Sequence, residues 1–282
     1  MGRVRTRLGE WHYDDYGFPR HPGDPAIVLL HGLMLDRRMW TAQLGGLRAL
    51  GRVVVFDGPG HGLSDVPPPF TLEQQGEAIA DALGGLGIER ALLVGHSWGA
   101  LAALRFALAH PESTAGLAIV AGSAEPESVL RRLEYRLYLA WVSRFGVPRW
   151  FARARLGALV YGAGARRARP ALLEDLGRTV NSHPRDGLAR AARAVIDRDG
   201  MTSRLSEIRV PTLVACGRSD RTMEPARSEG LARRIPGARL QWVSCGHTPP
   251  VERPDEINAA LATFVRRVLS AHAPPRDWVA CA

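Results

Sequence analysis

The chain has 282 residues, of which 46% are hydrophobic and 23% are charged, and this composition is typical of a globular protein with one large domain or two small ones. It excludes disordered, collagen-like and coiled-coil chains. All 37 basic residues are Arg, and the formal net charge is +9.

The chain alternates short apolar runs with helical patterns. The first element, Arg7–Tyr16, alternates as an antiparallel edge strand does. Five β-branched apolar runs predict strands buried on both faces of a parallel sheet: Ala26–Leu30, Arg52–Phe56, Ala91–Val94, Leu117–Val120 and Thr212–Ala215. Helical patterns are found at Met39–Leu50, Leu72–Leu86, Trp98–Ala109 and Asp255–Leu269. This order indicates βαβ units, and hence an α/β fold whose mostly parallel central sheet is flanked by helices.

The region 124–205 differs from the rest of the chain. It contains no strand-like run, and its 16 Arg against 8 Asp and Glu supply almost all of the net charge. We expect a helical insertion here, with residues 1–123 and 206–269 forming the α/β core and residues 270–282 forming a poorly ordered tail.

A candidate nucleophile follows the third buried strand. Gly95-His96-Ser97-Trp98-Gly99 lies between a predicted strand and a predicted helix, which is the setting of a nucleophile elbow. Gly95 and Gly99 fit this setting, because larger side chains at these positions would collide with the neighbouring strand and helix.

A serine nucleophile needs a base and an orienting carboxylate. Asp220 follows the strand PTLVACG, and His247 follows LQWVSCG. Both lie just past the carboxyl end of a strand, where active sites of open α/β sheets form. The order Ser97, Asp220, His247 is that of α/β hydrolases rather than of trypsin-like or subtilisin-like enzymes.

The chain resembles the serine hydrolases of the α/β-hydrolase fold, in particular the capped esterases and lactonases. The resemblance extends from about Arg7 to Leu269. Its five segments, in order, are His31-Gly32-Leu33, DGPGHGLSD (57–65), GHSWG (95–99), GRSDRTMEP (217–225) and CGHTPPVERP (245–254). The resemblance implies a triad of Ser97, Asp220 and His247 and an oxyanion hole formed by the backbone N–H groups of Leu33 and Trp98. It also implies that residues 124–205 form a mobile cap over the pocket.

Several residues have competing interpretations. Glu125 is a rival for the triad acid, because some relatives carry the carboxylate after that earlier strand. We expect Asp57 and Asp65 to brace the glycine-rich loop, His31 to order the oxyanion loop and His96 to pack or hydrogen-bond. The remaining histidines are expected at the surface, in turns or in the tail: His12, His21, His61, His110, His183 and His272.

The chemistry is best described as hydrolysis of a carboxylic ester or lactone with a small, largely apolar substrate. Ser97 stands where haloalkane dehalogenases and epoxide hydrolases of this fold carry an aspartate. Hydrolysis of carbon–carbon bonds in ring-cleavage products is an alternative, although the HGxGPG pattern of those enzymes is missing and Thr248 replaces their usual Trp. A catalytically weak member that binds a small ligand is the other alternative.

The sequence also bears on the location of the protein, on the state of its cysteines and on its need for a cofactor. No apolar run approaches the ~20 residues that span a bilayer, and MGRVRTRLGEWHYDD lacks the apolar core of a secretory signal, so we expect a cytoplasmic location. Three cysteines without CxxC spacing, Cys216, Cys245 and Cys281, predict free thiols, and we expect no metal and no cofactor.

The expected cap has two surfaces of interest. Leu130, Leu133, Leu137, Trp141 and Phe145 fall on one helical face, which we expect to dock the cap helix. The arginines indicate a solvated face, with attraction of anionic substrates or peripheral contact with lipid as the alternative. No nucleic-acid motif accompanies them, and the oligomeric state is left open.

Overall fold

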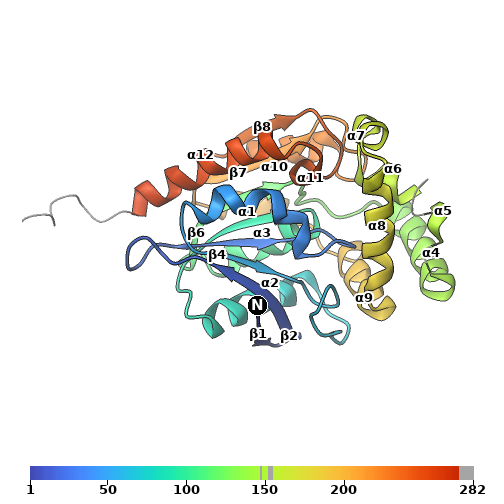
Figure 1. Cartoon of the computed structure of the whole chain (residues 1–282), viewed down its shortest axis with the longest axis horizontal. Coiled ribbons are helices and arrows are strands. Elements are labelled where there is room, and N and C mark those ends of the chain that lie inside the picture. The colour runs from blue at the N-terminus through green and yellow to red at the C-terminus, as the bar shows by residue number, and fades with distance from the viewer. Residues whose placement is uncertain (147, 152–154, 273–282) are drawn as a thin grey trace, which may run out of the picture.

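The computed structural model describes residues 1–146, 148–151 and 155–272, and contains one eight-stranded sheet with the order β1-β2-β4-β3-β5-β6-β7-β8 (Figure 1). Its strands are β1 (Gly2–Thr6), β2 (Gly9–Tyr16), β3 (Ala26–Leu30), β4 (Val53–Phe56), β5 (Ala91–His96), β6 (Thr114–Val120), β7 (Thr212–Gly217) and β8 (Arg239–Val243). β2 pairs antiparallel with both β1 and β4, whereas β3 to β8 run parallel. The predicted α/β-hydrolase architecture is confirmed.

Helices cover both faces of this sheet. The core helices are α1 (Thr41–Arg48), α2 (Leu72–Gly85), α3 (Trp98–Ala109), α10 (Pro225–Arg234), α11 (Pro249–Glu252) and α12 (Pro254–His272), with 3-10 turns at Arg37–Trp40 and Thr202–Glu207. In β3, Val28 joins the apolar cluster under α2, α3 and α10, whereas Ile27 and Leu29 join the cluster under α1 and α12. Alternate residues therefore reach opposite cores, which explains the continuous apolar runs.

The first predicted strand is wrong in extent, because the chain opens with a hairpin. β1 and β2 pair from Gly2 opposite Tyr13 to Thr6 opposite Gly9, and Gly9 has φ +98° in the turn. β1 presents Val4 to the core while Arg3 and Arg5 point outward, so it has a single apolar anchor and no apolar run to reveal it.

The other boundaries shift less. The pattern at Met39–Leu50 divides into a 3-10 turn and α1. The terminal helix continues three residues beyond Leu269, to His272, because α12 keeps its apolar face on the sheet up to Val268 and Leu269. Residues 273–282, including Cys281, lie outside the described part of the chain, and Cys216 and Cys245 are free and buried.

The described part of the chain between β6 and β7 forms six helices: α4 (Val129–Phe145), α5 (Arg149–Phe151), α6 (Gly157–Val160), α7 (Ala163–Ala168), α8 (Ala171–Ser182) and α9 (Arg185–Ile196). In Figure 1 they gather at the right-hand side of the molecule, apart from α1, α2 and α12. The helices fall inside the region 124–205 that the sequence marks as an insertion.

The apolar stripe of α4 is exposed, which contradicts the expectation that it docks this helix. The side chains of Leu130, Leu133 and Leu137 are 81%, 58% and 65% exposed. The half-buried face instead carries Arg131 and Arg132, which bind acceptors at the base of the insertion. Those contacts set the rotation of α4 and turn the leucines outward. Peripheral contact with lipid through this helix stays a prediction.

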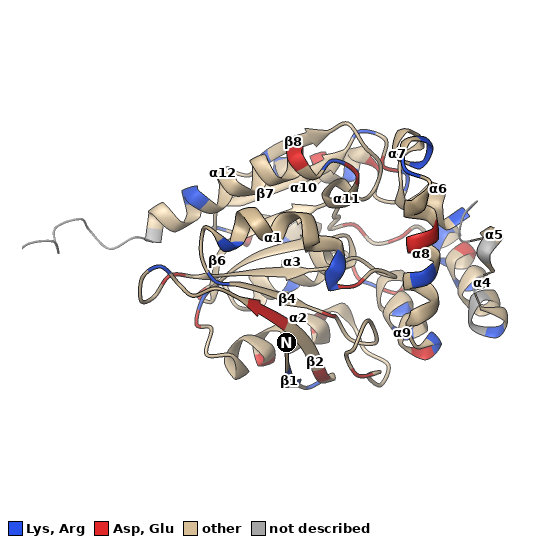
Figure 2. Ribbon diagram, in the orientation of Figure 1, with Lys and Arg blue, Asp and Glu red and all other residues tan. Residues whose placement is uncertain are grey.

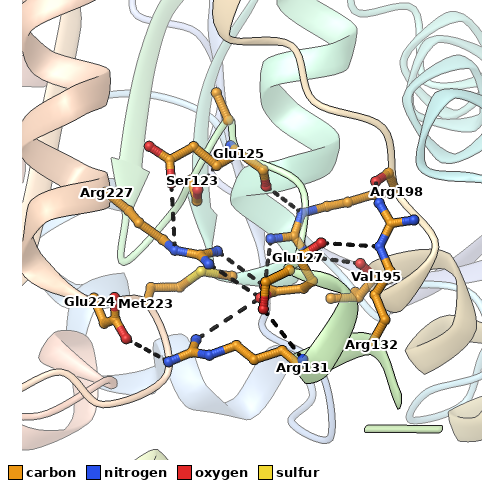
Figure 3. Close-up of polar contacts among 12 residues, drawn as sticks. Ser123, Glu125, Glu127, Arg131, Arg132, Val195, Arg198, Met223, Glu224 and Arg227 are labelled. Atoms are coloured by element: carbon orange, nitrogen blue, oxygen red, sulfur yellow. Dashed lines mark hydrogen bonds and ion pairs between the residues drawn. The ribbon is translucent and has the colours of Figure 1, made fainter. Parts of the chain in front are cut away.

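The two chain segments that join the insertion to the core are held together by a buried carboxylate (Figure 3). Glu127, where the chain enters the insertion, accepts a 2.7 Å hydrogen bond from Arg198, where the chain leaves it. Arg227 of α10 donates to both oxygens of Glu127, at 3.1 and 3.2 Å. The side chains of Glu127 and Arg198 are only 3% and 1% exposed, so solvent screens this pair little.

We expect Glu127→Gln to lower the free energy of unfolding by about 3 kcal/mol, because removing one partner of a buried ion pair leaves the other charge uncompensated. Chemical denaturation measures this change. Glu224→Gln is the matched control: Glu224 pairs with Arg131, but its side chain is 54% exposed, and loss of such a surface pair costs less than about 1 kcal/mol. Equal effects of the two substitutions would contradict the assigned role of Glu127.

Candidate active site

Ser97 lies on a sharp turn between β5 and α3. Its backbone has φ +48°, a conformation that a non-glycine residue adopts only under strain. A Cβ atom added at Gly95 would lie 2.6 Å from Cα of Ala100, and one added at Gly99 would lie 2.4 Å from the carbonyl oxygen of Leu30. Glycine is therefore required on both sides of Ser97, for the steric reason inferred from the sequence.

The structure brings Ser97, His247 and Asp220 into one chain of hydrogen bonds. Nε2 of His247 lies 2.9 Å from Oγ of Ser97, and Nδ1 lies 2.8 Å from Oδ2 of Asp220. A carboxylate can only accept, so Nδ1 carries the ring proton and Nε2 is left as the acceptor for the serine hydroxyl. All three residues are buried.

Asp220 is fixed by its own loop. Its Oδ1 accepts hydrogen bonds from the backbone N–H groups of Thr222, at 2.8 Å, and Met223, at 2.9 Å. Oδ2 is thereby directed at His247. The carboxylate stays correctly oriented without a contribution from solvent.

Glu125, the rival acid, takes part in a different set of contacts. Its carboxylate lies 3.8 Å from Nε of Arg227, and its side chain is 45% exposed. The carboxylate hydrogen-bonded to the ring of His247 is that of Asp220.

The loop after β3 approaches the elbow. Among the described residues, no acceptor bonds the backbone N–H of Leu33 or that of Trp98, the first residue of α3. His31 orders this loop, as expected: its Nδ1 lies 2.8 Å from the carbonyl oxygen of Gly32, and its Nε2 accepts from the N–H of Gly58. Met34 follows with φ +66°.

His96 connects the elbow to the loop of the candidate base. Its Nε2 lies 2.8 Å from the carbonyl oxygen of His247, so the ring donates a proton to that carbonyl. The sequence suggested packing or hydrogen bonding for His96, and the structure contains this bond.

Three of the histidines that the sequence placed at the surface, in turns or in the tail are buried, which the sequence did not reveal: His12, His61 and His183. Nε2 of His61 accepts from the N–H of Met34 at 3.2 Å, and Nδ1 of His183 accepts from the N–H of Gly62 at 3.0 Å. His183, between α8 and α9, thus binds the insertion to the glycine-rich loop. The adjacent glycines in GPGHG were the available signal, because they mark a backbone that neighbours approach closely.

Asp57 and Asp65 brace the glycine-rich loop, as the sequence suggested. Oδ2 of Asp57 accepts from the N–H of Leu63 at 3.0 Å, and Oδ2 of Asp65 accepts from the N–H of Glu10 at 2.9 Å. The insertion packs directly on this loop, because a Cβ atom added at Gly60 would lie 2.6 Å from Cα of Gly187 in α9.

Burial keeps four histidines of this region neutral. Desolvation lowers the pKa of His31 and His61, that of His96 to about 3 and that of His183 to about 4. Three of them, His31, His61 and His183, also use one ring nitrogen as an acceptor, and protonation would abolish that hydrogen bond.

These lowered pKa values predict acid-sensitive stability. As the pH falls below about 6.5, the unfolded chain binds protons at these histidines and the folded chain does not, so the folded state loses about 1.4 kcal/mol per pH unit for each of them. The loss at His183 continues to about pH 4. Urea denaturation at pH 7 and pH 5 measures it: His183→Gln should reduce the pH dependence by one histidine's share. His21→Gln, at an exposed site, should not, and an unchanged slope in His183→Gln would contradict the interpretation.

The described residues offer neither a metal site nor a membrane-spanning helix. No group of three or more His, Cys, Asp or Glu side chains is arranged there to hold a metal ion. None of the helices in the same residues is long and apolar enough to cross a membrane. The cytoplasmic location stays a prediction.

Comparison with known proteins fits this geometry. The model of the alpha/beta hydrolase family matches residues 27–260. The chain belongs to this family. A putative carbamate hydrolase RutD from Caulobacter vibrioides is 29% identical over 260 residues, which cover 90% of this chain and 94% of the relative.

Solved structures of alpha/beta hydrolases are similar over almost the whole chain. A thermophilic esterase from Thermogutta terrifontis has a TM-score of 0.87 at 29% identity, covering 97% of this chain and 100% of the esterase. The enol-lactonase from Burkholderia xenovorans LB400 has a TM-score of 0.85 at 27% identity, covering 94% of this chain and 100% of the lactonase. The chain therefore belongs to a family of hydrolases, and it is similar to an esterase and to an enol-lactonase.

Proposed function

We propose that this alpha/beta hydrolase cleaves a carboxylic ester or lactone of a small, largely apolar substrate through an acyl-enzyme on Ser97. The observation that carries the proposal is the hydrogen-bonded chain from Ser97 Oγ through His247 to Asp220, with distances of 2.9 and 2.8 Å. This arrangement is what a serine hydroxyl requires to become a nucleophile at neutral pH.

In the first half of the reaction, Oγ of Ser97 attacks the carbonyl carbon while Nε2 of His247 takes its proton. Asp220 holds the ring through Nδ1 and stabilises the imidazolium that forms. The N–H groups of Leu33 and Trp98 bind the negative oxygen of the tetrahedral intermediate. Collapse expels the alcohol, which receives the proton from Nε2.

In the second half, water attacks the acyl-enzyme with His247 again acting as base. The new carboxylic acid leaves, and Ser97 regains its proton. In a lactone the alcohol and the acid belong to one molecule, so the leaving group stays attached through the acyl chain until water releases the hydroxy acid. The same residues serve both substrates.

The choice of ester or lactone is supported by the relatives with which the chain shares both fold and length, an esterase and an enol-lactonase. The putative carbamate hydrolase suggests one further carbonyl substrate. A carbamate carries nitrogen on the carbonyl carbon, and the same serine would attack it.

We also propose that residues 124–205 act as the cap over the substrate pocket. Two hydrogen bonds support this placement: Thr222 Oγ1 donates to the carbonyl of Leu159, and Thr248 Oγ1 donates to the carbonyl of Val160. They attach the segment around α6 to the loops that carry Asp220 and His247.

A labelling and turnover experiment tests the proposed function. A fluorophosphonate should label Ser97 in the whole chain, and a short p-nitrophenyl ester should be turned over at least about tenfold faster than the p-nitrophenyl carbamate of equal size. Labelling with faster carbamate turnover would replace the ester by the carbamate as substrate class. The absence of both labelling and turnover would favour the weakly catalytic ligand-binding alternative. Cleavage of a ring-cleavage product but of neither probe would favour the carbon–carbon hydrolase.

A further inference from the structure

A cavity of about 580 Å³ lies beside the triad, at α6 and α7. Its walls come from the segment 158–169 and from the loops that follow β7, β8 and α11. Neither Ser97, Asp220 nor His247 lines it. The volume falls in the range of small-molecule binding sites.

The lining of this cavity is strongly basic. Its charged side chains are Arg166, Arg167, Arg169, Arg221, Arg253 and Glu252. Figure 2 shows the basic residues of α7 at this edge of the molecule. Five cations face one anion, so the cavity attracts negative ligands.

The single carboxylate of the cavity is already saturated. Oε2 of Glu252 accepts from the backbone N–H groups of Gly162, at 2.8 Å, and Gly246, at 3.1 Å. Oε1 accepts from the N–H of Thr248 at 3.1 Å. Glu252 therefore organises the backbone around the cavity and is not the ion-pair partner of the arginines.

Among the described residues, Arg253 pairs with Glu256, whereas four arginines of the cavity have no ion-pair partner: Arg166, Arg167, Arg169 and Arg221. Of these four, Arg169 donates a hydrogen bond to the backbone carbonyl of Glu252. Nε of Arg166 is buried and makes no hydrogen bond within the described part of the chain. A buried donor without an acceptor is costly, and no hydrogen bond at this nitrogen fixes the Arg166 guanidinium to another described residue.

The arginines of α4 differ in this respect. Arg131 binds Glu224 at 2.5 Å, and Arg136 binds Asp197 at 2.6 Å, whereas Arg132 donates to the backbone carbonyls of Glu127 and Arg198. Their charge is used within the protein. Arg131 and Arg136 of α4 are thus neutralised by carboxylates of the described residues, whereas Arg166, Arg167, Arg169 and Arg221 at the cavity are not.

We propose that this cavity is a binding site for a small organic polyanion, a molecule with two or more carboxylate or phosphate groups. Guanidinium groups bind such oxyanions through paired N–H donors. Ala158, Leu159 and Ala165 in the same walls provide apolar contact for the carbon skeleton. The site is independent of the proposed ester hydrolysis, because it shares no residue with the triad.

The site adjoins the loops that carry the acid and the base of the triad. Ser219 lines the cavity and precedes Asp220, and Gly246 lines it and precedes His247. A ligand in the cavity would contact both loops without touching the side chain of Asp220 or that of His247.

Isothermal titration calorimetry at low ionic strength tests the site, with inorganic pyrophosphate and citrate as polyanion probes and acetate and neutral inositol as controls. The whole chain should bind both polyanions with 1:1 stoichiometry and neither control. Arg166→Gln with Arg221→Gln should weaken binding by at least about tenfold, since the two substitutions remove two positive charges and their charge-assisted N–H donors from the site. Arg193→Gln with Arg209→Gln, two exposed arginines outside the cavity, should leave the affinity within about twofold.

Equal affinity of the wild type and the Arg166, Arg221 variant would overturn the proposal, and so would equal losses in both double variants. Modification of the wild type by phenylglyoxal gives a second readout that needs no variant. Pyrophosphate should protect Arg166 and Arg221, but not Arg193, as read by peptide mass spectrometry. Equal modification with and without pyrophosphate would also overturn it.

Discussion

Ser97→Ala is expected to reduce the turnover of an activated ester by about six orders of magnitude, by analogy with other serine triads. Alanine removes Oγ, the atom that lies 2.9 Å from Nε2 of His247, and no acyl-enzyme can form. The N–H groups of Leu33 and Trp98, which we propose as the oxyanion hole, remain in this variant and would account for residual catalysis. Turnover of a p-nitrophenyl ester, with titration of active sites by a fluorophosphonate, measures the loss.

The variant should fold as the wild type does. Alanine keeps the Cβ atom and removes only the hydroxyl, so the strain of the turn at φ +48° is unchanged. Thermal unfolding within a few degrees of the wild type is the control. More than a tenth of wild-type turnover in such a folded variant would exclude Ser97 as the nucleophile.

Asp220→Asn is expected to lower turnover by about 10⁴, the loss seen when the orienting acid of a triad becomes an amide. The local hydrogen bonds give the reason. Because the N–H groups of Thr222 and Met223 bond Oδ1 of Asp220, the carbonyl oxygen of the new amide would take that position and its NH₂ group would face His247. Nδ1 would then have to accept, the proton would move to Nε2, and the ring could not act as base.

Glu125→Gln is the matched control for that loss. It makes the same change of carboxylate to amide at a side chain that is 45% exposed and contacts Arg227, so turnover should change less than about threefold. If Glu125→Gln lost more turnover than Asp220→Asn, and both variants were folded, Glu125 after β6 would be the triad acid.

The parallel strands and the candidate triad could be predicted because each depends on local chemistry. β3 and β5 are buried on both faces, so their apolar runs are unbroken. The elbow needs glycine at 95 and 99 for steric reasons that local geometry imposes. Asp220 and His247 could be located because each lies a few residues past the end of a strand, β7 for Asp220 and β8 for His247.

The features that the sequence did not predict depend on distant partners. His61 and His183 look like loop residues, but His61 packs against the rings of His31, Trp98 and His183, and α9 approaches the glycine-rich loop closely beside them. The rotation of α4 is set by the acceptors that Arg131 and Arg132 find at Glu224 and Glu127. The spacing of the leucines in the sequence gives no sign of these acceptors. Helical spacing identifies the apolar stripe but not the direction in which it points.

If residues 124–205 cover the pocket, as we propose, the buried contacts of Glu127 limit the motions by which this cap can open. A rigid rotation of the whole insertion would move Glu127 and Arg198 together and would separate Glu127 from Arg227 of α10, and loss of a buried ion pair costs about 3–5 kcal/mol. At that cost, such a rotated state would make up about one molecule in a hundred or fewer. For the proposed cap, we therefore expect substrate and product to pass by displacement of its outer helices relative to one another, while its attachment to the sheet stays fixed.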